Sequence, residues 1–341
     1  MCPKGSASAP NEQEQGMVMN NKQMTLAGSG FEKFAKTTRR AQFLAEMQRV
    51  VPWGELCALV EPVYPKGGSG AGRPPVPLER MLRIYFLQHW FNLSDPAVEE
   101  ALYESASMRA FAGIDLGAEP APDETTVCKF RHLLERNNLG TRIFQEVGRH
   151  LQSQGLHVSS GTIVDATIIS APSSTKNAEG KRDPEMHQTK KGKDWHFGMK
   201  AHVGVDRKTK LIHSVAATPA NVADGNMLGE LLHGSETHVW GDAAYSGRTE
   251  RIQAKAPKAK DFTQRRGRGY RYLSDYDRWI NRARSRVRAR VEHSIGVIKR
   301  VFGFAKVRYR GIAKNANRLF VTCALANLFI ARHHLIRAQG A

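Results

Sequence analysis

The periodicity of the sequence changes near residue 160, and this change limits the folds that the chain can adopt. Residues 161–169 are β-branched or apolar at nearly every position, which is typical of a central strand with both faces buried. Apolar and polar residues then alternate over 195–206, which predicts a strand with one buried face. Further elements are expected in this order: a hairpin connection at 206–210, a strand at 211–218, a helix from about 223 and a strand at 238–242. This order predicts a mixed α/β fold.

The residues before this change have helical periodicity. Apolar residues recur at three-to-four spacing from Thr38 and again over 78–91. Ser94 and Asp123 each precede a helix as capping side chains. The helix after Asp123 presents polar side chains as a helix-turn-helix does, although any small helical bundle shares this pattern. The predicted segments are a flexible arm at 1–36, an all-α domain at 37–155 with a linker or exposed loop at 65–74, and an α/β domain at 156–341.

Positive charge is concentrated in the last quarter of the chain. The whole chain has 51 Lys+Arg and 32 Asp+Glu, which gives a net charge of +19. Residues 1–250 contain 28 charges of each sign, whereas residues 251–341 contain 23 basic and 4 acidic side chains. A basic block of this density is typical of a protein that binds nucleic acid, because neutralised phosphates release condensed counterions. The apolar residues within the block argue against a merely solvated tail.

Three carboxylates stand out by their surroundings. Asp165 lies in an otherwise apolar strand, where a carboxylate is costly unless it is coordinated or hydrogen-bonded. Asp242 ends a short strand, and ligands of open α/β sheets gather beyond the carboxyl ends of strands. Glu292 is the single acidic residue among the last 64, and helical geometry places it beside Arg288 and Lys299 at the edge of an apolar face. Taken singly, each aspartate also suits a capping or turn role, and Glu292 suits a plain ion pair with Arg288.

Taken together, three carboxylates from two strands and a helix, beside a basic surface, would suit Mg²⁺ as ligands. This ion binds one or two carboxylates and completes its shell with water and phosphate oxygens. Two such ions, about 3.5–4 Å apart, activate an attacking oxygen and stabilise the leaving oxygen during displacement at phosphorus. A basic surface beside three carboxylates therefore predicts metal-dependent chemistry on a phosphodiester.

Four blocks of the sequence resemble those of bacterial insertion-sequence transposases. The blocks are Ile163-Val164-Asp165-Ala166-Thr167, Trp195 to His202, Gly241-Asp242-Ala243-Ala244-Tyr245, and Arg288 through Glu292 to Lys299-Arg300. In this order, between about Thr38 and the C-terminus, the chain resembles DDE transposases of the insertion-sequence-four/five group. That family's last block usually carries a tyrosine, an arginine, a glutamate and a lysine. Arg288, Glu292 and Lys299 match it, whereas Ser285 stands at the tyrosine position.

This resemblance implies a ribonuclease-H-like catalytic domain at 156–341, with Asp165, Asp242 and Glu292 as its catalytic, metal-binding triad. It implies a DNA transposase that cleaves the ends of its insertion sequence and transfers the 3′-hydroxyls into target DNA. The reaction would use Mg²⁺, with Mn²⁺ as the substitute ion. The domain at 37–155 is expected to bind the terminal inverted repeats, and a homodimer or larger assembly is expected on DNA. The residues expected to contact DNA are Arg288, Lys299, Lys200, Arg284, Arg300, Lys129 and Arg131.

Two other functions fit the same residues. A metal-dependent DNA nuclease with this triad would hydrolyse DNA without joining a 3′-hydroxyl to a target. A catalytically inactive relative would bind DNA without any need for metal. The roles of Trp195 and Tyr245 also stay open, because each could stack on DNA bases or pack in a core.

No feature of the sequence predicts a membrane or secreted protein. The longest apolar run, 319–331, has 13 residues and is too short to span a bilayer. The N-terminal residues lack the pattern of a secretion signal. The four cysteines are scattered without paired spacing, so the sequence supports neither a disulfide framework nor a thiolate zinc site. We therefore expect a cytoplasmic protein, which the resemblance places on the bacterial nucleoid.

Overall fold

The computed structural model describes residues 36–67, 74–267 and 272–340. The predicted flexible arm therefore lies outside the described residues except for Lys36, and so does most of the predicted linker at 65–74. Residues from Arg40 onward belong to one compact unit, which holds the sheet and its covering helices.

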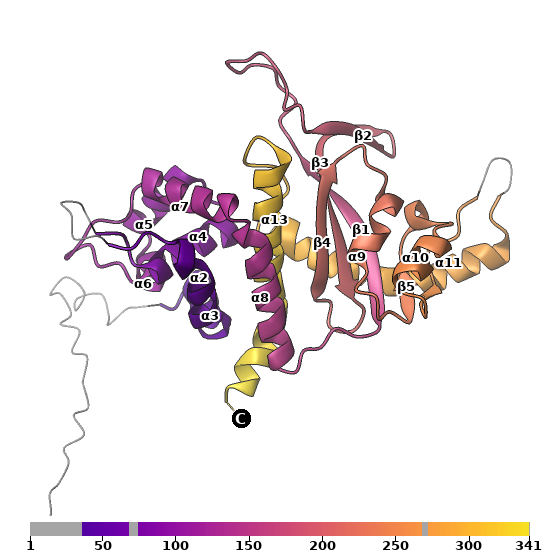
Figure 1. Ribbon diagram of the computed structural model, residues 1–341, viewed down its shortest axis with the longest axis horizontal. Helices are drawn as coiled ribbons and strands as arrows, with labels where there is room; N and C mark the ends of the chain where they lie inside the picture. Colours follow the sequence, from indigo (N-terminus) through magenta and orange to yellow (C-terminus); the bar gives the residue numbers. More distant parts are fainter. Residues whose placement is uncertain (1–35, 68–73, 268–271, 341) are drawn as a thin grey trace, which may run out of the picture. The chain divides into compact units, whose positions relative to one another are not determined.

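Helices alone precede the first strand in the described part of the chain (Figure 1). Both predicted caps are present, because Ser94 accepts a hydrogen bond from the Ala97 amide at 3.2 Å and Asp123 accepts one from the Thr126 amide at 2.7 Å. Pro52 separates the first two helices, as expected of a residue that lacks a backbone donor. The helices before the first strand are α2 (Arg39–Val50), α3 (Trp53–Val60), η2 (Glu61–Val63), α4 (Leu78–Trp90), α5 (Asp95–Glu104), α6 (Ala106–Ala112), α7 (Glu124–Arg136) and α8 (Leu139–Ser153).

A mixed six-stranded sheet follows, in the order β2-β3-β1-β5-β6 with β4 also paired to β3. Its strands are β1 (Gly161–Ser170), β2 (His187–Lys191), β3 (Asp194–Asp206), β4 (Ile212–Pro219), β5 (His238–Trp240) and β6 (Lys260–Asp261). β3 runs antiparallel to β1, β2 and β4, whereas β5 runs parallel to β1 and β6. The mixed α/β prediction is confirmed, and β2 and β6 are strands that periodicity did not predict.

The two faces of β1 contribute to two separate cores. Ile163 and Ile169 belong to the larger core, which includes α12, α13 and the helices before the sheet. Val164 belongs to a smaller core with residues of α9 and Tyr245. Because side chains alternate along a strand, Asp165 lies on the face of Ile163 and hence on the side of the larger core.

The predicted helix from 274 to about 300 is divided into three parts. The Glu292 amide donates to the Ala289 carbonyl three residues earlier, at 3.2 Å, which tightens the chain between two helices. A π-helical turn then follows. The helical elements between β4 and the last helix are η3 (Asp224–Met227), α9 (Leu228–Leu231), η4 (Ala243–Tyr245), α10 (Thr249–Lys255), α11 (Asp275–Arg288), α12 (Val291–Gly296) and η5 (Val297–Val301).

The long helix α13 (Ile312–Ala338) packs against the sheet and against the helices that precede the sheet (Figure 1). It contacts β4 of the sheet as well as α4 and α8. Its length and apolar composition would suffice to cross a membrane, but 61% of the apolar window is buried inside the protein, as in a core helix. The polar residue Asn327 is satisfied within this core, because its side chain bonds the Ile212 amide at 2.8 Å and the Ile212 carbonyl at 2.7 Å.

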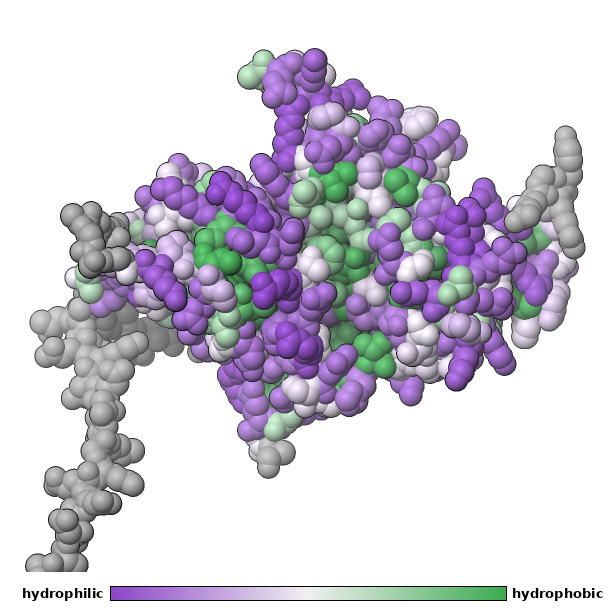
Figure 2. All heavy atoms as spheres, viewed as in Figure 1, coloured by the Kyte–Doolittle hydropathy of each residue, from purple (hydrophilic) through white to green (hydrophobic). Residues whose placement is uncertain are grey.

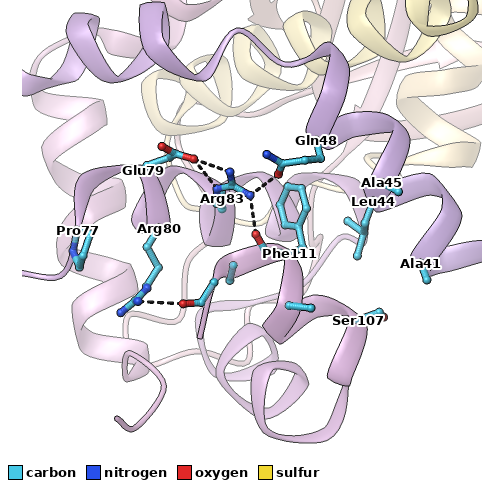
Figure 3. Close-up of a pocket in the computed structure, with 13 residues that line it drawn as sticks. Ala41, Leu44, Ala45, Gln48, Pro77, Glu79, Arg80, Arg83, Ser107 and Phe111 are labelled. Carbon is cyan, nitrogen blue, oxygen red and sulfur yellow. Dashed lines mark hydrogen bonds and ion pairs between the residues drawn. The ribbon is translucent and has the colours of Figure 1, made fainter. Parts of the chain in front are cut away.

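The helices before the sheet also form a surface pocket of about 600 Å³. Figure 2 shows hydrophobic side chains among hydrophilic ones on the surface of this part of the protein. Figure 3 shows Arg83 at the centre of the pocket, where its guanidinium bonds Glu79, Gln48 and the Phe111 carbonyl. The guanidinium is therefore fully engaged with the protein, and the pocket holds none of the predicted catalytic carboxylates.

Candidate active site

Asp165 lies within β1, and Asp242 follows the end of the neighbouring strand β5 by two residues. The parallel strands β1 and β5 pair Ile163 with Trp240, so each aspartate is two residues beyond this pair. A step of two residues returns to the same face of a strand, and neighbouring strands are about 4.8 Å apart. The backbone of Asp242 is extended, with φ −76° and ψ −176°, and so continues β5. This register places both carboxylates on one face of the sheet, and Asp242 at the carboxyl end of its strand.

Asp242 also has the local role that its position in the sequence allows. Its Oδ1 accepts a hydrogen bond from the Ala244 amide at 2.8 Å and caps η4. Its side chain remains only half-buried, so solvent reaches it. The capping contact fixes the direction of the side chain and leaves the second carboxylate oxygen for another ligand.

Arg288 links Asp165 to Glu292. Its Nη1 donates to Oδ2 of Asp165 at 3.2 Å, and its Nη2 donates to Oε1 of Glu292 at 3.1 Å. Arg288 ends α11 and Glu292 lies in the first turn of α12, so the tight connection between these helices sets their spacing. The ion pair expected between Arg288 and Glu292 is therefore present, and a carboxylate from β1 shares the same guanidinium.

Burial dominates the electrostatics of Asp165, whose side chain is 13% exposed. Burial raises the pKa of Asp165 to about 6, although the charge of Arg288 and a hydrogen bond from the Ala166 amide both lower it. The negative charges of Asp242 and Asp224 raise this pKa further. An additional cation would stabilise the ionised form of Asp165 in this environment. Carboxylates whose pKa is shifted in this way occur in many functional sites.

Lys299 binds the same strand beyond Asp165. Its Nζ donates to Oγ1 of Thr167 at 3.2 Å and to the Ile168 carbonyl at 2.9 Å. Burial lowers the pKa of Lys299, and the nearby charge of Lys191 lowers it further. Lys299 belongs to the π-helical turn η5, and turns of this kind occur frequently at functional sites. Together with Arg288, it gives this face of β1 two positive charges near Asp165.

The remaining residues predicted to contact DNA differ in accessibility. Arg300 and Lys129 are exposed. Arg284 is half-buried, donates to the Thr263 carbonyl and lies 5.5 Å from the centre of the Phe262 ring. Lys200 is largely buried in an ion pair with Asp224, whose Oδ1 is 2.9 Å from its Nζ. In this conformation Lys200 is not presented to a DNA backbone.

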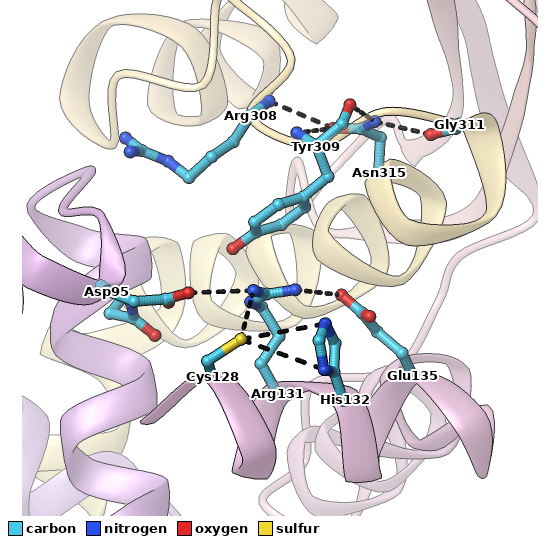
Figure 4. A network of polar contacts seen from close by, with 10 residues as sticks. Asp95, Cys128, Arg131, His132, Glu135, Arg308, Tyr309, Gly311 and Asn315 are labelled. Atoms are coloured by element: carbon cyan, nitrogen blue, oxygen red, sulfur yellow. Dashed lines mark hydrogen bonds and ion pairs between the residues drawn. The ribbon is translucent and has the colours of Figure 1, made fainter. Parts of the chain in front are cut away.

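Arg131 lies in the protein interior, with 6% of its surface exposed. Figure 4 shows its guanidinium between two carboxylates, at 2.9 Å from Asp95 and 3.1 Å from Glu135. The ring of Tyr309 lies 4.1 Å from the same guanidinium. The structure therefore gives Arg131 a different role from the predicted DNA contact: it joins α5 and α7 to the segment before α13.

Sequence reasoning did not identify a polar cluster on the opposite face of β1. His202 pairs with Ala166 across β1 and β3, so it lies on the face away from Asp165. Its Nδ1 is 3.9 Å from Oδ1 of Asp224, its Nε2 bonds Thr218 at 2.8 Å, and burial lowers its pKa to about 4. A polar side chain on a buried face of β3, such as His202, needs a polar partner. The presence of His202 in the strand is therefore the sequence signal that could have indicated a partner such as Asp224.

Of the two aromatic residues whose roles were left open, one is buried and one is exposed. Tyr245 is completely buried in the smaller core, so packing is its role in this structure. Trp195 is 67% exposed, and this contradicts a core position.

The carboxylates suit a divalent cation in their chemistry, although an arginine now lies between two of them. Throughout the described ranges, no three His, Cys, Asp or Glu side chains are close enough together to hold a metal ion. The guanidinium of Arg288 instead bonds Asp165 and Glu292 at the same time. Three carboxylates from two strands and a helix are the hard oxygen ligands that Mg²⁺ or Mn²⁺ prefers. The chemistry of these donors fits such an ion, but among the described residues the predicted triad is not assembled around a metal position.

Comparison with known proteins identifies the family of the chain. Residues 156–328 match the family model of the transposase DDE domain, and residues 32–133 match a second model described as a transposase domain. Among solved structures, the chain is similar to the cryo-EM structure of the piggyBac transposase synaptic complex with hairpin DNA, with a TM-score of 0.48 and 9% identity. This alignment covers 87% of the present chain and 76% of the piggyBac chain. Because the DDE-domain match spans half of the sequence, the chain belongs to the DDE transposases.

Proposed function

We propose that this transposase cleaves the ends of an insertion sequence and joins the resulting 3′-hydroxyls to target DNA. Asp165, Asp242 and Glu292 are the proposed catalytic triad. The observation that carries this proposal is that Asp165 and Asp242 each lie two residues beyond the Ile163–Trp240 pair of β1 and β5, with Glu292 tied to Asp165 through Arg288. Membership of the insertion-sequence-four/five group and a ribonuclease-H-like catalytic region are parts of the same proposal. Within the six-stranded sheet, β1, β3 and β4 form an antiparallel set, and β5 and β6 continue the sheet parallel to β1, which supports that fold assignment.

The three carboxylates would hold two Mg²⁺ ions, for which Mn²⁺ would substitute. Bound there, the ions would activate the attacking oxygen and stabilise the leaving oxygen at phosphorus. Asp165 lies at the buried end of the site and Glu292 at its exposed end, with side-chain exposures of 13% and 61%. This difference makes Glu292 the ligand that can adjust its position when DNA binds. Arg288 and Lys299 would orient the phosphate, because a guanidinium and an ammonium both bind phosphate oxygens.

The two proposed steps use the same displacement at phosphorus. In the first step, water attacks the phosphodiester at the element end, the P–O3′ bond breaks and a 3′-hydroxyl is released. In the second step, this hydroxyl attacks a target phosphodiester, a new P–O3′ bond forms and the target strand leaves with its own 3′-hydroxyl. Strand transfer therefore breaks one phosphodiester bond and forms another, so it requires no external energy source.

The remaining parts of the proposal concern the partners. The helices at 37–155 would bind the terminal inverted repeats, with the exposed Lys129 on α7 as one contact. Arg284 and Arg300 would contribute contacts near the catalytic face. Joining two element ends requires that two sites act together, so we propose a dimer or a larger assembly on DNA. The reaction would take place in the cytoplasm, where the nucleoid supplies the target.

The test is a cleavage and joining assay with purified protein. The substrate is a plasmid that carries the DNA flanking the coding sequence on both sides, incubated with Mg²⁺. Asp165→Ala and Asp242→Ala should each abolish strand cleavage while DNA binding stays nearly intact. Asp275→Ala is a matched control, because Asp275 is an acidic residue on the surface of α11 whose side chain is 98% exposed. The control should cleave as the unmodified protein does.

The assay also separates the alternatives. Retained cleavage in either aspartate variant would refute the triad. A nuclease would cut the plasmid but fail to join pre-cut ends that carry a free 3′-hydroxyl. An inactive relative would bind the flanking DNA equally with Mg²⁺ or EDTA and would neither cut nor join it.

A further inference from the structure

A two-stranded ribbon of residues 187–196 has no role in the site described above. It consists of β2 and the first residues of β3, which pair antiparallel. Within the described chain, β1 joins β3 only from Gly198 onward, so the ribbon has no further strand beside it (Figure 1). Its residues are exposed, apart from Thr189 and His196, which are half-buried. Neither face of the ribbon therefore covers a hydrophobic core.

The base of the ribbon is held firmly by the protein. Met186, which precedes it, is 3% exposed and belongs to the larger core. Phe197 follows it, and its ring lies 5.5 Å from the guanidinium of Arg182, while its carbonyl accepts a hydrogen bond from the Ala171 amide at 2.8 Å. These contacts fix the direction of the ribbon before any ligand binds, which reduces the entropic cost of binding.

The exposed part of the ribbon is basic and carries one aromatic side chain. Lys190, Lys191 and Lys193 outnumber the single acidic residue, Asp194. In the part of the chain that the structure covers, no carboxylate forms an ion pair with any of these three lysines. Trp195 is 67% exposed, and Nζ of Lys190 lies 6.0 Å from the centre of its ring. Unpaired lysines around an exposed indole suit a polyphosphate ligand with aromatic bases.

The positive charge of the ribbon continues toward the proposed catalytic face. Lys191 is close enough to Lys299 for its charge to lower the pKa of that residue. Lys299 in turn contacts Thr167, which is two residues from Asp165 on the same strand face. A linear anion lying across Asp165 would therefore meet Lys299 and then the ribbon.

We propose that the ribbon at 187–196 binds a groove of duplex DNA beside the strand that is cleaved. Lys190, Lys191 and Lys193 contact backbone phosphates, and Trp195 packs against the nucleotides between them. A two-stranded ribbon has the dimensions to enter the major groove, which is about 12 Å wide. This inference rests on the proposed function, because it adds a DNA contact to the same reaction.

The test measures how the affinity for DNA depends on salt. The probe is a fluorescein-labelled duplex of about 30 base pairs and arbitrary sequence, titrated in EDTA at several KCl concentrations. In the variant K190Q/K191Q/K193Q, the slope of log Kd against log salt should fall by about 0.9 for each phosphate that the protein no longer neutralises. If the variant and the unmodified protein bind DNA equally at about 1 M salt, this change of slope corresponds at about 0.15 M salt to a Kd increase of roughly 30-fold for two phosphates and about 170-fold for three. Trp195→Ala should weaken binding with an unchanged slope, and Trp195→Phe should restore much of the affinity.

The variant K255Q/K258Q/K260Q provides the matched control. These three lysines are also exposed, but they lie where β6 begins, at the end of the parallel strands opposite Asp242. Their replacement removes the same net charge and, because none of the three is a proposed DNA contact, should change the slope less than the ribbon variant does. Equal slopes for the ribbon variant and the unmodified protein would overturn the ribbon contact, as would an equal change of slope in the control. If the unmodified protein failed to bind any DNA, the proposed function itself would fail, which is a distinguishable result.

Discussion

Replacing Asp165 with asparagine should stabilise the metal-free protein, and increasingly so as the pH rises. Asparagine has nearly the same shape but cannot ionise. Burial raises the pKa of Asp165 to about 6, from an ordinary value of 3.8, despite the opposing charge of Arg288. The folded protein therefore holds a proton in a pH range in which the unfolded chain has already released it. Between these two pKa values, the free energy of unfolding falls as the pH rises, because folding takes up a proton.

The size of the effect follows from the two pKa values. One pKa unit corresponds to about 1.4 kcal/mol, so ionised Asp165 costs about 3 kcal/mol at neutral pH. About 1 kcal/mol of this cost is already present at pH 4.5, because the carboxylate of the unfolded chain ionises there. The stability advantage of Asp165→Asn over the unmodified protein should therefore grow by about 2 kcal/mol between pH 4.5 and pH 7.5.

Urea denaturation in EDTA at these two pH values measures the difference. Asp206→Asn is a control of opposite sign: burial raises the pKa of Asp206, but hydrogen bonds from Ser159 and Thr209 outweigh it and lower this pKa overall. Ionised Asp206 therefore stabilises the fold above its unfolded pKa, and its replacement should destabilise the protein at pH 7.5. If Asp165→Asn gave no larger advantage at pH 7.5 than at pH 4.5, the assignment of a buried, costly carboxylate would be wrong.

Three further predictions test other contacts. Arg288→Ala should tighten Mn²⁺ binding to the DNA-free protein in calorimetry, because the guanidinium now neutralises Asp165 and Glu292, and unchanged or weaker binding would contradict this. Arg131→Met should lower the free energy of unfolding in urea by about 3–5 kcal/mol, because it leaves the carboxylates of Asp95 and Glu135 without their cation. Its control is Arg278→Ala, which breaks an exposed ion pair and should lower this free energy by less than about 0.5 kcal/mol. Gly140→Ala should cost about 1–3 kcal/mol in the same assay, because its Cβ would lie 2.7 Å from the Asn317 carbonyl oxygen, whereas Gly148→Ala in the same helix has open space and should be neutral or stabilising.

Much of the sheet is predictable because its central strands have simple surroundings. β1 is buried on both faces, as the residues of 161–169 predict. β3 lies where its alternating residues predict a strand, but the prediction of a single buried face is wrong, because residues 201–206 are buried on both faces. β2 escapes prediction because neither of its faces packs on a core, so the sequence His187–Lys191 contains no apolar alternation. β6 has two residues, which is too short for any period. The strands that periodicity misses are those stabilised by backbone pairing rather than by burial.

The site was predictable in its carboxylates and less so in its cations. Asp165 stands out because a charge within an apolar strand needs a physical reason. The spacing of Arg288 and Glu292 predicts their ion pair, but only the packing of α11 on the sheet shows that Asp165 shares it. Arg131 illustrates the limit, because its charge alone suggested a surface position. Asp95 and Glu135, which hold it inside, are 36 and 4 residues away along the chain.

The position of α13 has a consequence for how the protein is made. This helix lies against β4 on one side and against α4 and α8 on the other, yet the ribosome synthesises it after all of them. The apolar surfaces of the sheet and of the earlier helices therefore stay exposed until residues 312–338 have been synthesised. A chain interrupted before Ile312 would leave these surfaces open to proteases and aggregation rather than yield a stable competitor for DNA.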